Sequence, residues 1–197
     1  AIYVSVTSSD KSNNHSVLVD WNNSLVGWWR FNNETGENET FIKDYSKYKN
    51  NGTAINGPVY NASGKWGKGM QFDGVNDYVN VSNESNFDFD RFSNYSISAW
   101  VKTTSNGAIY AKMSGGVPYD GYDLFVDGNG KLKTHLINTW SSNAITKISD
   151  NSINDNNWHH VAVTYNGTST TAGIALYIDG SVASTSSDAT SLTSSIL

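Results

Sequence analysis

Apolar and polar residues alternate with a period of two in several short segments of the chain. Ile97, Ala99 and Val101 are separated by single residues, and the segment from Tyr122 to Val126 has the same spacing. Successive side chains of a β-strand point to opposite faces of a sheet, so this spacing predicts half-buried strands. By the same criteria we expect further strands at residues 26–31, 70–72, 78–81 and 158–165.

Turn residues between such segments predict two β-hairpins. Residues 127–130 read Asp-Gly-Asn-Gly and precede an alternating segment at 131–137, while Asp179-Gly180 joins 174–178 to 181–184. Glycine and asparagine accept the positive φ that tight turns require. No stretch carries an apolar stripe with the 3.6-residue period of a helix. The predicted fold class is therefore all-β, an antiparallel two-sheet sandwich with almost no helix.

The two ends of the chain differ from its middle. Residues 1–20 contain one short alternating segment at 2–6 and then a polar run, which we interpret as an N-terminal strand or leader, or the end of a preceding module. Residues 21–197 form the predicted main domain. Within it, residues 184–197 are rich in Ser and Thr with little to bury, which is typical of a linker or of a strand approach that is cut short.

Composition excludes several classes of partner and chemistry. Charged residues make up 16% of the 197 positions, the formal net charge is −5, and Lys and Arg form no run, so nucleic acid is an unsuitable partner. Cysteine is absent, which excludes disulfides and thiolate sites. No apolar stretch reaches the roughly 20 residues that a membrane-spanning helix needs.

Asn-x-Ser/Thr sequons occur about twice as often as this composition would produce by chance. Such sequons accept N-linked glycans in secreted proteins, so the excess predicts an extracellular or cell-surface glycoprotein. An Asn-rich polar surface is the alternative explanation. The ten sequons begin at Asn14, Asn22, Asn33, Asn38, Asn51, Asn61, Asn80, Asn83, Asn94 and Asn166.

Five blocks of sequence occur in a fixed order along the chain. They are Leu25–Phe31 with Asp44-Tyr45-Ser46 and Asn51-Gly52-Thr53, then Gly64–Val79, Tyr95–Lys102, Trp158–Tyr165 and Leu176–Gly180. In this order the blocks resemble the laminin-G-like, or concanavalin A-like, jelly-roll modules that are common in bacterial and archaeal surface proteins. The resemblance implies a two-sheet jelly-roll used mainly to bind glycans or proteins. Fold alone carries function weakly, because function depends on the site that the fold supports.

The chain also departs from this family after the Asp179-Gly180 turn. The family continues with a strand reading roughly Ile-Gly and a final strand with an Ile-Asp-Glu-Val-like segment, and neither occurs before Leu197. We therefore expect a jelly-roll that lacks its last strand, either as a C-terminally incomplete piece or with the strand supplied by a partner. An open edge strand exposes unpaired N–H and C=O groups, so a homo-oligomer or a strand-donating partner could complete the sheet.

Catalysis is not expected. Glycoside hydrolases of this architecture place two carboxylates in a Glu-x-Asp-x-x-Glu motif, and the four Glu residues, at positions 34, 37, 39 and 84, form no such motif. The pairs Asp88 with Asp90 and Asp123 with Asp127 share a strand face, but their sequence surroundings are typical of loops and turns. We predict no catalytic residues.

The histidines give no metal or nucleophile motif. His159 and His160 are adjacent on a predicted strand and should point to opposite faces, so they cannot readily bind one ion. His15 and His135 are isolated in the sequence.

Calcium is the expected cofactor, in a structural role. It prefers six to eight oxygen ligands from loop residues, and the family often holds an ion near such acids. One predicted ligand group is Asp44 with Asp73 and Asp77, and the other is Asp120 with Asp123. The alternative for both groups is that the acids cap turns through Asx hydrogen bonds.

A saccharide site needs a flat aromatic ring for the apolar side of the sugar and polar groups for its hydroxyls. Trp140 with Asn138 on one predicted loop, and Tyr119 with Asp120 on another, best fit this description. The tryptophans inside the five blocks are more often core residues. These are Trp28, Trp29, Trp66, Trp100 and Trp158.

Together these features predict a non-catalytic extracellular recognition module that binds a glycan or a protein partner as part of a larger surface protein. The alternative is a structural subunit of a surface layer or fibre, assembled by strand exchange. A glycoside hydrolase is the least favoured of the three because the carboxylate motif is missing.

Overall fold

The structure is a computed structural model that describes residues 23–197. The segment at 2–6 and the sequons at Asn14 and Asn22 lie outside the described residues. The chain divides into two compact units, of which the first ends at Asn86 and the second runs from Phe87 to Leu197. Every strand pairing in the described part is antiparallel, and its only helices are two 3₁₀ turns, so the prediction of an all-β sandwich with almost no helix is confirmed.

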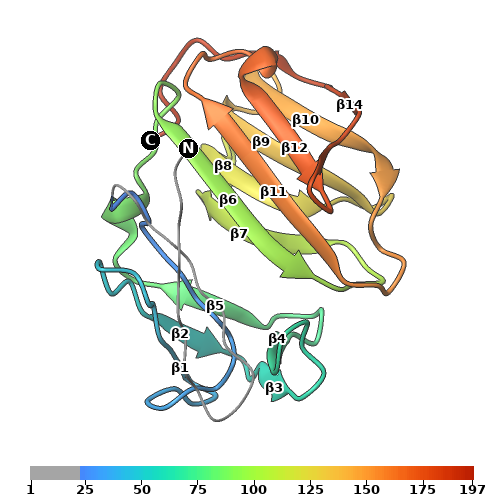
Figure 1. The fold of residues 1–197 in the computed structure, drawn as a ribbon. Coiled ribbons are helices and arrows are strands. Elements are labelled where there is room, and N and C mark those ends of the chain that lie inside the picture. Colours follow the sequence, from blue (N-terminus) through green and yellow to red (C-terminus); the bar gives the residue numbers. More distant parts are fainter. Residues whose placement is uncertain (1–22) are drawn as a thin grey trace, which may run out of the picture. The chain divides into compact units, whose positions relative to one another are not determined.

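The first unit contains a small three-stranded sheet in the order β1-β2-β5 and a separate β3–β4 hairpin (Figure 1). Ile42 and Ala54 are its buried apolar strand residues. The bounds are β1 (Phe41–Ile42), β2 (Gly52–Ile55), β3 (Val59–Asn61), β4 (Gly69–Gln71) and β5 (Tyr78–Val81), followed by the 3₁₀ turn η1 (Glu84–Phe87).

The strand predicted at residues 26–31 is absent. Trp29 makes a single isolated bridge with Asp44, and the Trp28 N–H donates to the Asp44 carboxylate rather than to a neighbouring strand. Phe31 then takes a φ of +52°, in the left-handed region, which ends the extended course of the backbone. Hydrogen bonds between its main chain and the side chains of Asp44, Ser46 and Asn50 therefore largely replace strand pairing in this segment.

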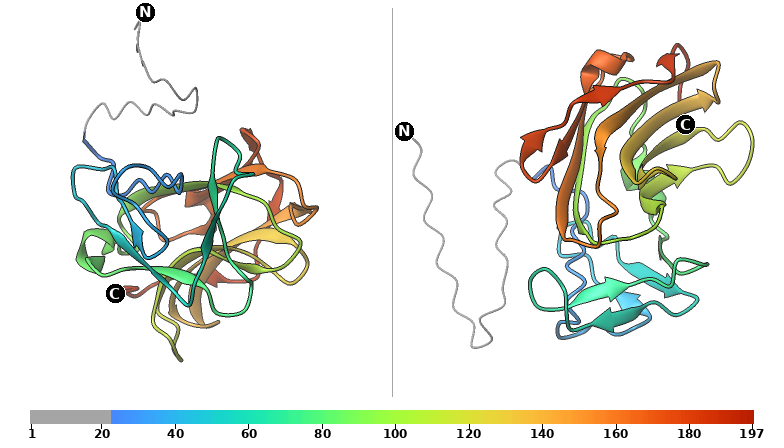
Figure 2. Two further views of the ribbon diagram at one scale, coloured as in Figure 1. Left: turned by 90° about the horizontal axis from the view of Figure 1, so that it is seen from below. Right: turned by 90° about the vertical axis from the view of Figure 1, so that its right-hand side faces the viewer.

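The second unit is a sandwich of two sheets, seen as two layers in Figures 1 and 2. The six-stranded sheet has the order β14-β10-β9-β8-β7, with β15 also paired to β10, and the four-stranded sheet has the order β13-β12-β11-β6. The bounds are β6 (Asn94–Val101), β7 (Gly107–Met113), β8 (Gly121–Val126), β9 (Lys131–Thr139), β10 (Asn143–Ser152), β11 (His159–Asn166), the 3₁₀ turn η2 (Thr171–Gly173), β12 (Ile174–Ile178), β13 (Ser181–Val182), β14 (Thr185–Ser186) and β15 (Thr190–Ser191).

Most predicted strands are present, including both hairpins, which are β8–β9 and β12–β13. The turn of the first hairpin is held by Asp127, whose carboxylate accepts the N–H groups of Asn129 and Lys131. The sequence patterns do not predict β7 or β10. A register shift between Ala108 and Tyr110 breaks the alternation in β7, and three consecutive residues of β10, Ala144–Thr146, are all buried.

The core of the second unit is formed by alternate residues of both sheets. Leu124, Leu132 and Leu136 from the six-stranded sheet and Val161 and Leu176 from the four-stranded sheet are fully buried in one cluster. Burying a side chain of this size stabilises the fold by about 1.5–3 kcal/mol relative to leaving it in water. Because strand side chains alternate, these inward residues place their neighbours on the outer faces of the sandwich.

The C-terminal stretch is packed onto the second unit and is not a linker. Its strands β14 and β15 pair with β10, and Leu192 and Ile196 are buried in the core. The Ile196 N–H also donates to the Asp90 carboxylate at 2.8 Å. Three buried side chains, those of Ala189, Leu192 and Ile196, act together with these strand pairings and hydrogen bonds to fix a Ser- and Thr-rich segment. No helix in the described residues is long and apolar enough to cross a membrane.

Candidate ligand-binding face

Seven residues form a polar and aromatic cluster on the outer side of the six-stranded sheet. Leu124, Leu132 and Leu136 point into the core, so the residues directly before and after each of them point to the outer side of the sheet. The register places Phe125 opposite Lys133 and His135 opposite Thr146, which joins β8, β9 and β10 on this side. We call this cluster the site face, and it consists of Asp123, Phe125, Lys133, His135, Trp140, Thr146 and Asp188.

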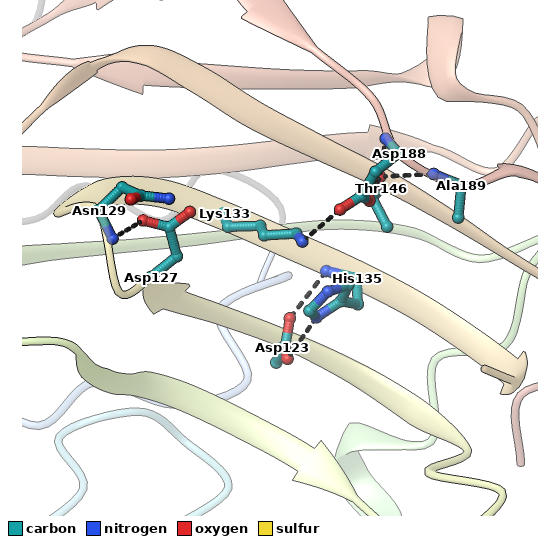
Figure 3. Close-up of polar contacts among 8 residues, drawn as sticks. All are labelled: Asp123, Asp127, Asn129, Lys133, His135, Thr146, Asp188 and Ala189. Atoms are coloured by element: carbon teal, nitrogen blue, oxygen red, sulfur yellow. Dashed lines mark hydrogen bonds and ion pairs between the residues drawn. The ribbon is translucent and has the colours of Figure 1, made fainter. Parts of the chain in front are cut away.

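Asp123 fixes the position of His135. One carboxylate oxygen of Asp123 accepts the main-chain N–H of His135 at 2.7 Å, and the other lies 2.9 Å from the ring atom Nδ1 (Figure 3). Asp123 is 8% exposed, so this carboxylate is buried and uses both oxygens within the protein. An ionised carboxylate only accepts hydrogen bonds, so Nδ1 carries the hydrogen of a neutral His135. Nε2 is then a lone-pair acceptor on the other side of the ring.

Two aromatic rings flank His135. Phe125 stacks on the imidazole with a centroid distance of 4.9 Å and an interplanar angle of 22°, and Trp140 meets it edge-on at 4.9 Å and 78°. Trp140 lies just beyond β9 and keeps 41% of its surface exposed. Its indole is therefore partly open to solvent beside a histidine whose orientation is fixed.

A second ion pair lies beside this ring. Lys133 Nζ is 2.7 Å from Asp188 Oδ2 and 5.6 Å from the centroid of the Trp140 ring. Thr146 Oγ1 donates to the other oxygen of Asp188 at 2.7 Å and accepts the Asp188 main-chain N–H (Figure 3). Asp188 comes from the segment between β14 and β15, so residues distant in sequence complete the cluster.

Asp188 is ionised at neutral pH. Partial burial by itself would raise the pKa of its carboxyl group, but hydrogen bonds from Lys133 and Thr146, with the charge of Lys133, outweigh burial and lower the pKa below its ordinary value. The carboxylate side chain remains 46% exposed. It can therefore accept further hydrogen bonds from solvent or from a ligand.

The ligand-binding residues predicted from sequence lie near one end of this face. The main-chain N–H of Trp140 donates to the Pro118 carbonyl at 3.3 Å, which brings the loop that contains Tyr119 next to Trp140. Tyr119 is 44% exposed. Asn138 lies at the end of β9, where its Nδ2 donates to the Ser195 carbonyl. Asp120 follows Tyr119 and is half-buried, with its carbonyl accepting the N–H of Ser114.

Asp44, predicted as a calcium ligand, is completely buried and uses its carboxylate within the chain. Oδ1 accepts the N–H groups of Trp28 and Ser46, while Oδ2 accepts the Ser46 hydroxyl and the Asn50 N–H, all between 2.6 and 2.8 Å. Four donors occupy the lone pairs that a metal would need. This arrangement is the turn-capping alternative.

Asp73 and Asp77 lie together in one exposed loop. Asp73 Oδ1 accepts the N–H groups of Val75 and Asn76, and the Asp73 N–H donates to Asp77 Oδ2 at 2.9 Å. In residues 23–197, no three His, Cys, Asp or Glu side chains gather as a metal would require. Calcium at Asp73, Asp77 or Asp120 therefore stays a prediction.

The sequon asparagines in the described part of the chain lie mostly on the surface. Seven of these eight are exposed, and Asn51 is half-buried with its Oδ1 accepting the Asp44 N–H. None of the block tryptophans is a buried core residue. Trp66 is 64% exposed and Trp100 is 39% exposed, and the other three are half-buried, so the core interpretation is wrong.

Sequence reasoning missed most of the site face. His135 is isolated in the sequence, whereas the structure pairs it with Asp123. Lys133, Thr146 and Asp188 were not among the predicted site residues. The hairpin itself carried a usable signal, because the outward positions of β8 and β9 include the Asp123–His135 pair and the Phe125–Lys133 pair. Asp188 gave no such signal, since its contacts reach across 42 and 55 residues.

Comparison with known proteins identifies the fold family. A family model described as the concanavalin A-like lectin/glucanases superfamily matches residues 73–195. No curated protein sequence matches the chain.

Two solved structures are similar to the chain. An S-layer domain-containing protein from Clostridium thermocellum is 25% identical, with a TM-score of 0.47 over 84% of this chain and 73% of that one. The binding domain of Paraclostridial Mosquitocidal Protein 1 is 21% identical, with a TM-score of 0.57, and the match covers 77% of this chain and 39% of that one. With the family model spanning more than half of its length, the chain belongs to the concanavalin A-like lectin/glucanase superfamily.

Proposed function

We propose that this protein is a non-catalytic recognition module that binds a saccharide on the site face, as part of a protein displayed outside the cell. The observation that carries the proposal is the half-exposed Trp140 ring beside an oriented His135 and the Lys133–Asp188 pair. The many exposed sequon asparagines support an extracellular setting.

The chemistry of the site face fits a sugar ring. The C–H side of a pyranose is apolar and packs against a flat aromatic ring, for which Trp140 is available. Sugar hydroxyls both donate and accept hydrogen bonds. Lys133 Nζ can donate to them, His135 Nε2 can accept from them, and the exposed Asp188 carboxylate can accept as well.

The two carboxylates of the face argue against hydrolysis. A glycoside hydrolase needs a general acid that stays protonated near neutral pH, hence a carboxyl group with a raised pKa. The pKa of Asp188 is lowered, because its hydrogen bonds and ion pair outweigh burial, and Asp123 uses both oxygens on His135. Both features support a non-catalytic role for the face.

The experiment is affinity electrophoresis of the full chain in gels that contain single polysaccharides. The wild type is expected to be retarded by at least one of them, and Trp140→Ala is expected to weaken that binding about tenfold or more. Trp100→Ala is the matched control, because Trp100 has a similar exposed fraction, 39% against 41%, but lies on β6 in the other sheet. No retardation by any polysaccharide, or equal losses in both variants, would refute the proposal.

A further inference from the structure

The acids of the site face are paired with basic side chains. Its two acids, Asp123 and Asp188, each contact one basic side chain, His135 at 2.9 Å and Lys133 at 2.7 Å. The Lys133 side chain is 12% exposed and the His135 side chain is 13% exposed, so both basic groups are largely enclosed. The face therefore presents no basic group without an acidic partner.

A negatively charged ligand would meet this arrangement at a cost. Its carboxylate or sulfate would approach Asp188, the most exposed charge of the face, and would have to compete with Asp188 for Lys133. Like charges brought together at a binding surface repel one another, which disfavours binding of the wrong partner. Asp120, in the loop whose Pro118 carbonyl accepts the Trp140 N–H, adds another acid at the rim.

A positively charged ligand gains little electrostatic binding energy on this face. Asp123 is buried and fully bonded to His135, and Asp188 is already neutralised by Lys133 and bonded to Thr146. The hydrogen-bonding capacity that remains consists of the other two N–H bonds of the Lys133 ammonium, Nε2 of His135 and exposed lone pairs on Asp188. These groups match hydroxyls, which can donate and accept together.

We propose that the ligand class of the site face is a neutral, hydroxyl-rich saccharide, read by Lys133, His135 and Asp188 beside the Trp140 ring. This inference rests on the proposed function and narrows it. In this proposal the Lys133–Asp188 pair determines specificity. The ammonium can still donate hydrogen bonds to hydroxyls, whereas the Asp188 carboxylate repels acidic sugars and competes with them for Lys133. Binding should therefore depend little on salt, since no net charge is neutralised.

The test compares neutral, acidic and cationic polysaccharides in the same electrophoretic assay. Galactomannan, β-glucan and pullulan serve as neutral probes, alginate and heparin as acidic probes, and chitosan as the cationic probe. Wild-type protein is expected to bind a neutral probe with less than about a twofold change in affinity between low and high salt, and to bind the charged probes at least about tenfold more weakly.

Asp188→Asn is the decisive variant. The amide keeps hydrogen-bonding groups for Lys133 and Thr146 but removes the charge, so the ammonium becomes available to anions. Binding of alginate or heparin is expected to rise about tenfold at low salt and to fall again at high salt. Asp88→Asn is the matched control. Asp88 is 45% exposed and forms an ion pair with Lys112, so it resembles Asp188 in exposure and pairing. Lys112 lies opposite Tyr122, on the alternation that points inward, so this pair does not belong to the site face.

The outcomes separate the two proposals. Wild-type binding to acidic or cationic probes that is lost in Trp140→Ala would overturn the neutral class and leave saccharide binding standing. An equal gain of acidic-probe binding in Asp188→Asn and Asp88→Asn would overturn the role of the Lys133–Asp188 pair. Absence of any Trp140-dependent saccharide binding would overturn the proposed function itself.

Discussion

Asp44 in the first unit and Asp123 in the second are both buried carboxylates, at 0% and 8% exposure, and both accept main-chain N–H groups. Around Asp44, four donors from Trp28, Ser46 and Asn50 close the cluster completely. Around Asp123, the second oxygen orients His135, which extends the network to a half-exposed tryptophan. The first cluster ends inside the protein and the second leads to its surface.

This difference separates structural from functional polar groups. A buried carboxylate whose partners all belong to the chain stabilises the fold, because removing it leaves several donors without water or acceptor. A carboxylate that orients a partly accessible side chain can also serve recognition. We therefore expect the two carboxylates to have different roles, which their accessible hydrogen-bonding capacity distinguishes.

The largest effect is expected from Asp44→Ala. Its four donors would lose their acceptors inside the first unit, which should lower the free energy of unfolding by about 3 kcal/mol or more. Denaturant unfolding measures this loss. Because Asp44 is saturated by protein donors, the loss should be the same with calcium and with a chelator. A loss that appears only with calcium present would restore Asp44 as a metal ligand.

Asp123→Ala is expected to have a smaller effect on stability and a strong effect on binding. The His135 N–H would lose its acceptor and the imidazole its orientation, so unfolding should cost about 1–3 kcal/mol less. Saccharide affinity should fall about tenfold, as in Trp140→Ala. Urea denaturation and affinity electrophoresis of one preparation measure both. Lost stability with unchanged affinity would place Asp123 with Asp44, as a purely structural acid.

The smallest effect is expected at a third cluster, which lies outside the site face. His159 contacts Asp179 at 2.7 Å and Asp155 at 3.1 Å. Partial burial would lower the pKa of His159, but hydrogen bonds to both acids outweigh burial and raise the pKa above 6.5. The pKa of Asp155 is lowered to about 2, first by a hydrogen bond from the Asn157 side chain.

The signs of these shifts define a pH window. A raised histidine pKa stabilises the fold fully below the unfolded value of 6.5, and this stabilisation is lost as pH rises through the folded pKa. The lowered pKa values of Asp155 and Asp179 stabilise the fold above 3.8, and this stabilisation is lost as pH falls through their folded values. Melting temperatures of wild type and His159→Gln should therefore differ most between about pH 4 and 6.5. A difference that grows above pH 7 would contradict the assignment, and saccharide binding should not change.

Much of the sandwich was predictable because its strands follow the period-two rule. The alternation that includes Leu124 and Leu136, with the Gly-rich turn at Asp127, predicts the hairpin of β8 and β9. Strand β10 escaped prediction because its outer side is covered by the C-terminal segment, where the Ala189 N–H donates to Thr146 Oγ1. A strand that is buried on both faces shows no alternation of apolar and polar residues.

The site face was predictable in part, from its rim and from the outward positions of the β8–β9 hairpin. Trp140 stood out as an aromatic residue among loop amides and Tyr119 as one beside Asp120, and the structure brings their loops together at the Pro118 carbonyl. The Lys133–Asp188 pair depends on how the segment after β13 folds back along β10. Sequence periodicity describes faces of single strands, so it cannot show which distant segment will supply a charge.

The most direct test of saccharide binding on the site face is a nuclear magnetic resonance titration of ¹⁵N-labelled protein with a short neutral oligosaccharide. The seven tryptophans give separate indole N–H signals, which can be assigned by single substitutions. We predict shifts of the Trp140 indole and of the His135 ring nitrogens, with the Trp100 indole on β6 unchanged. Trp100 and His160 lie together on the four-stranded sheet, with ring centroids 5.3 Å apart. Shifts confined to these two residues would contradict the account.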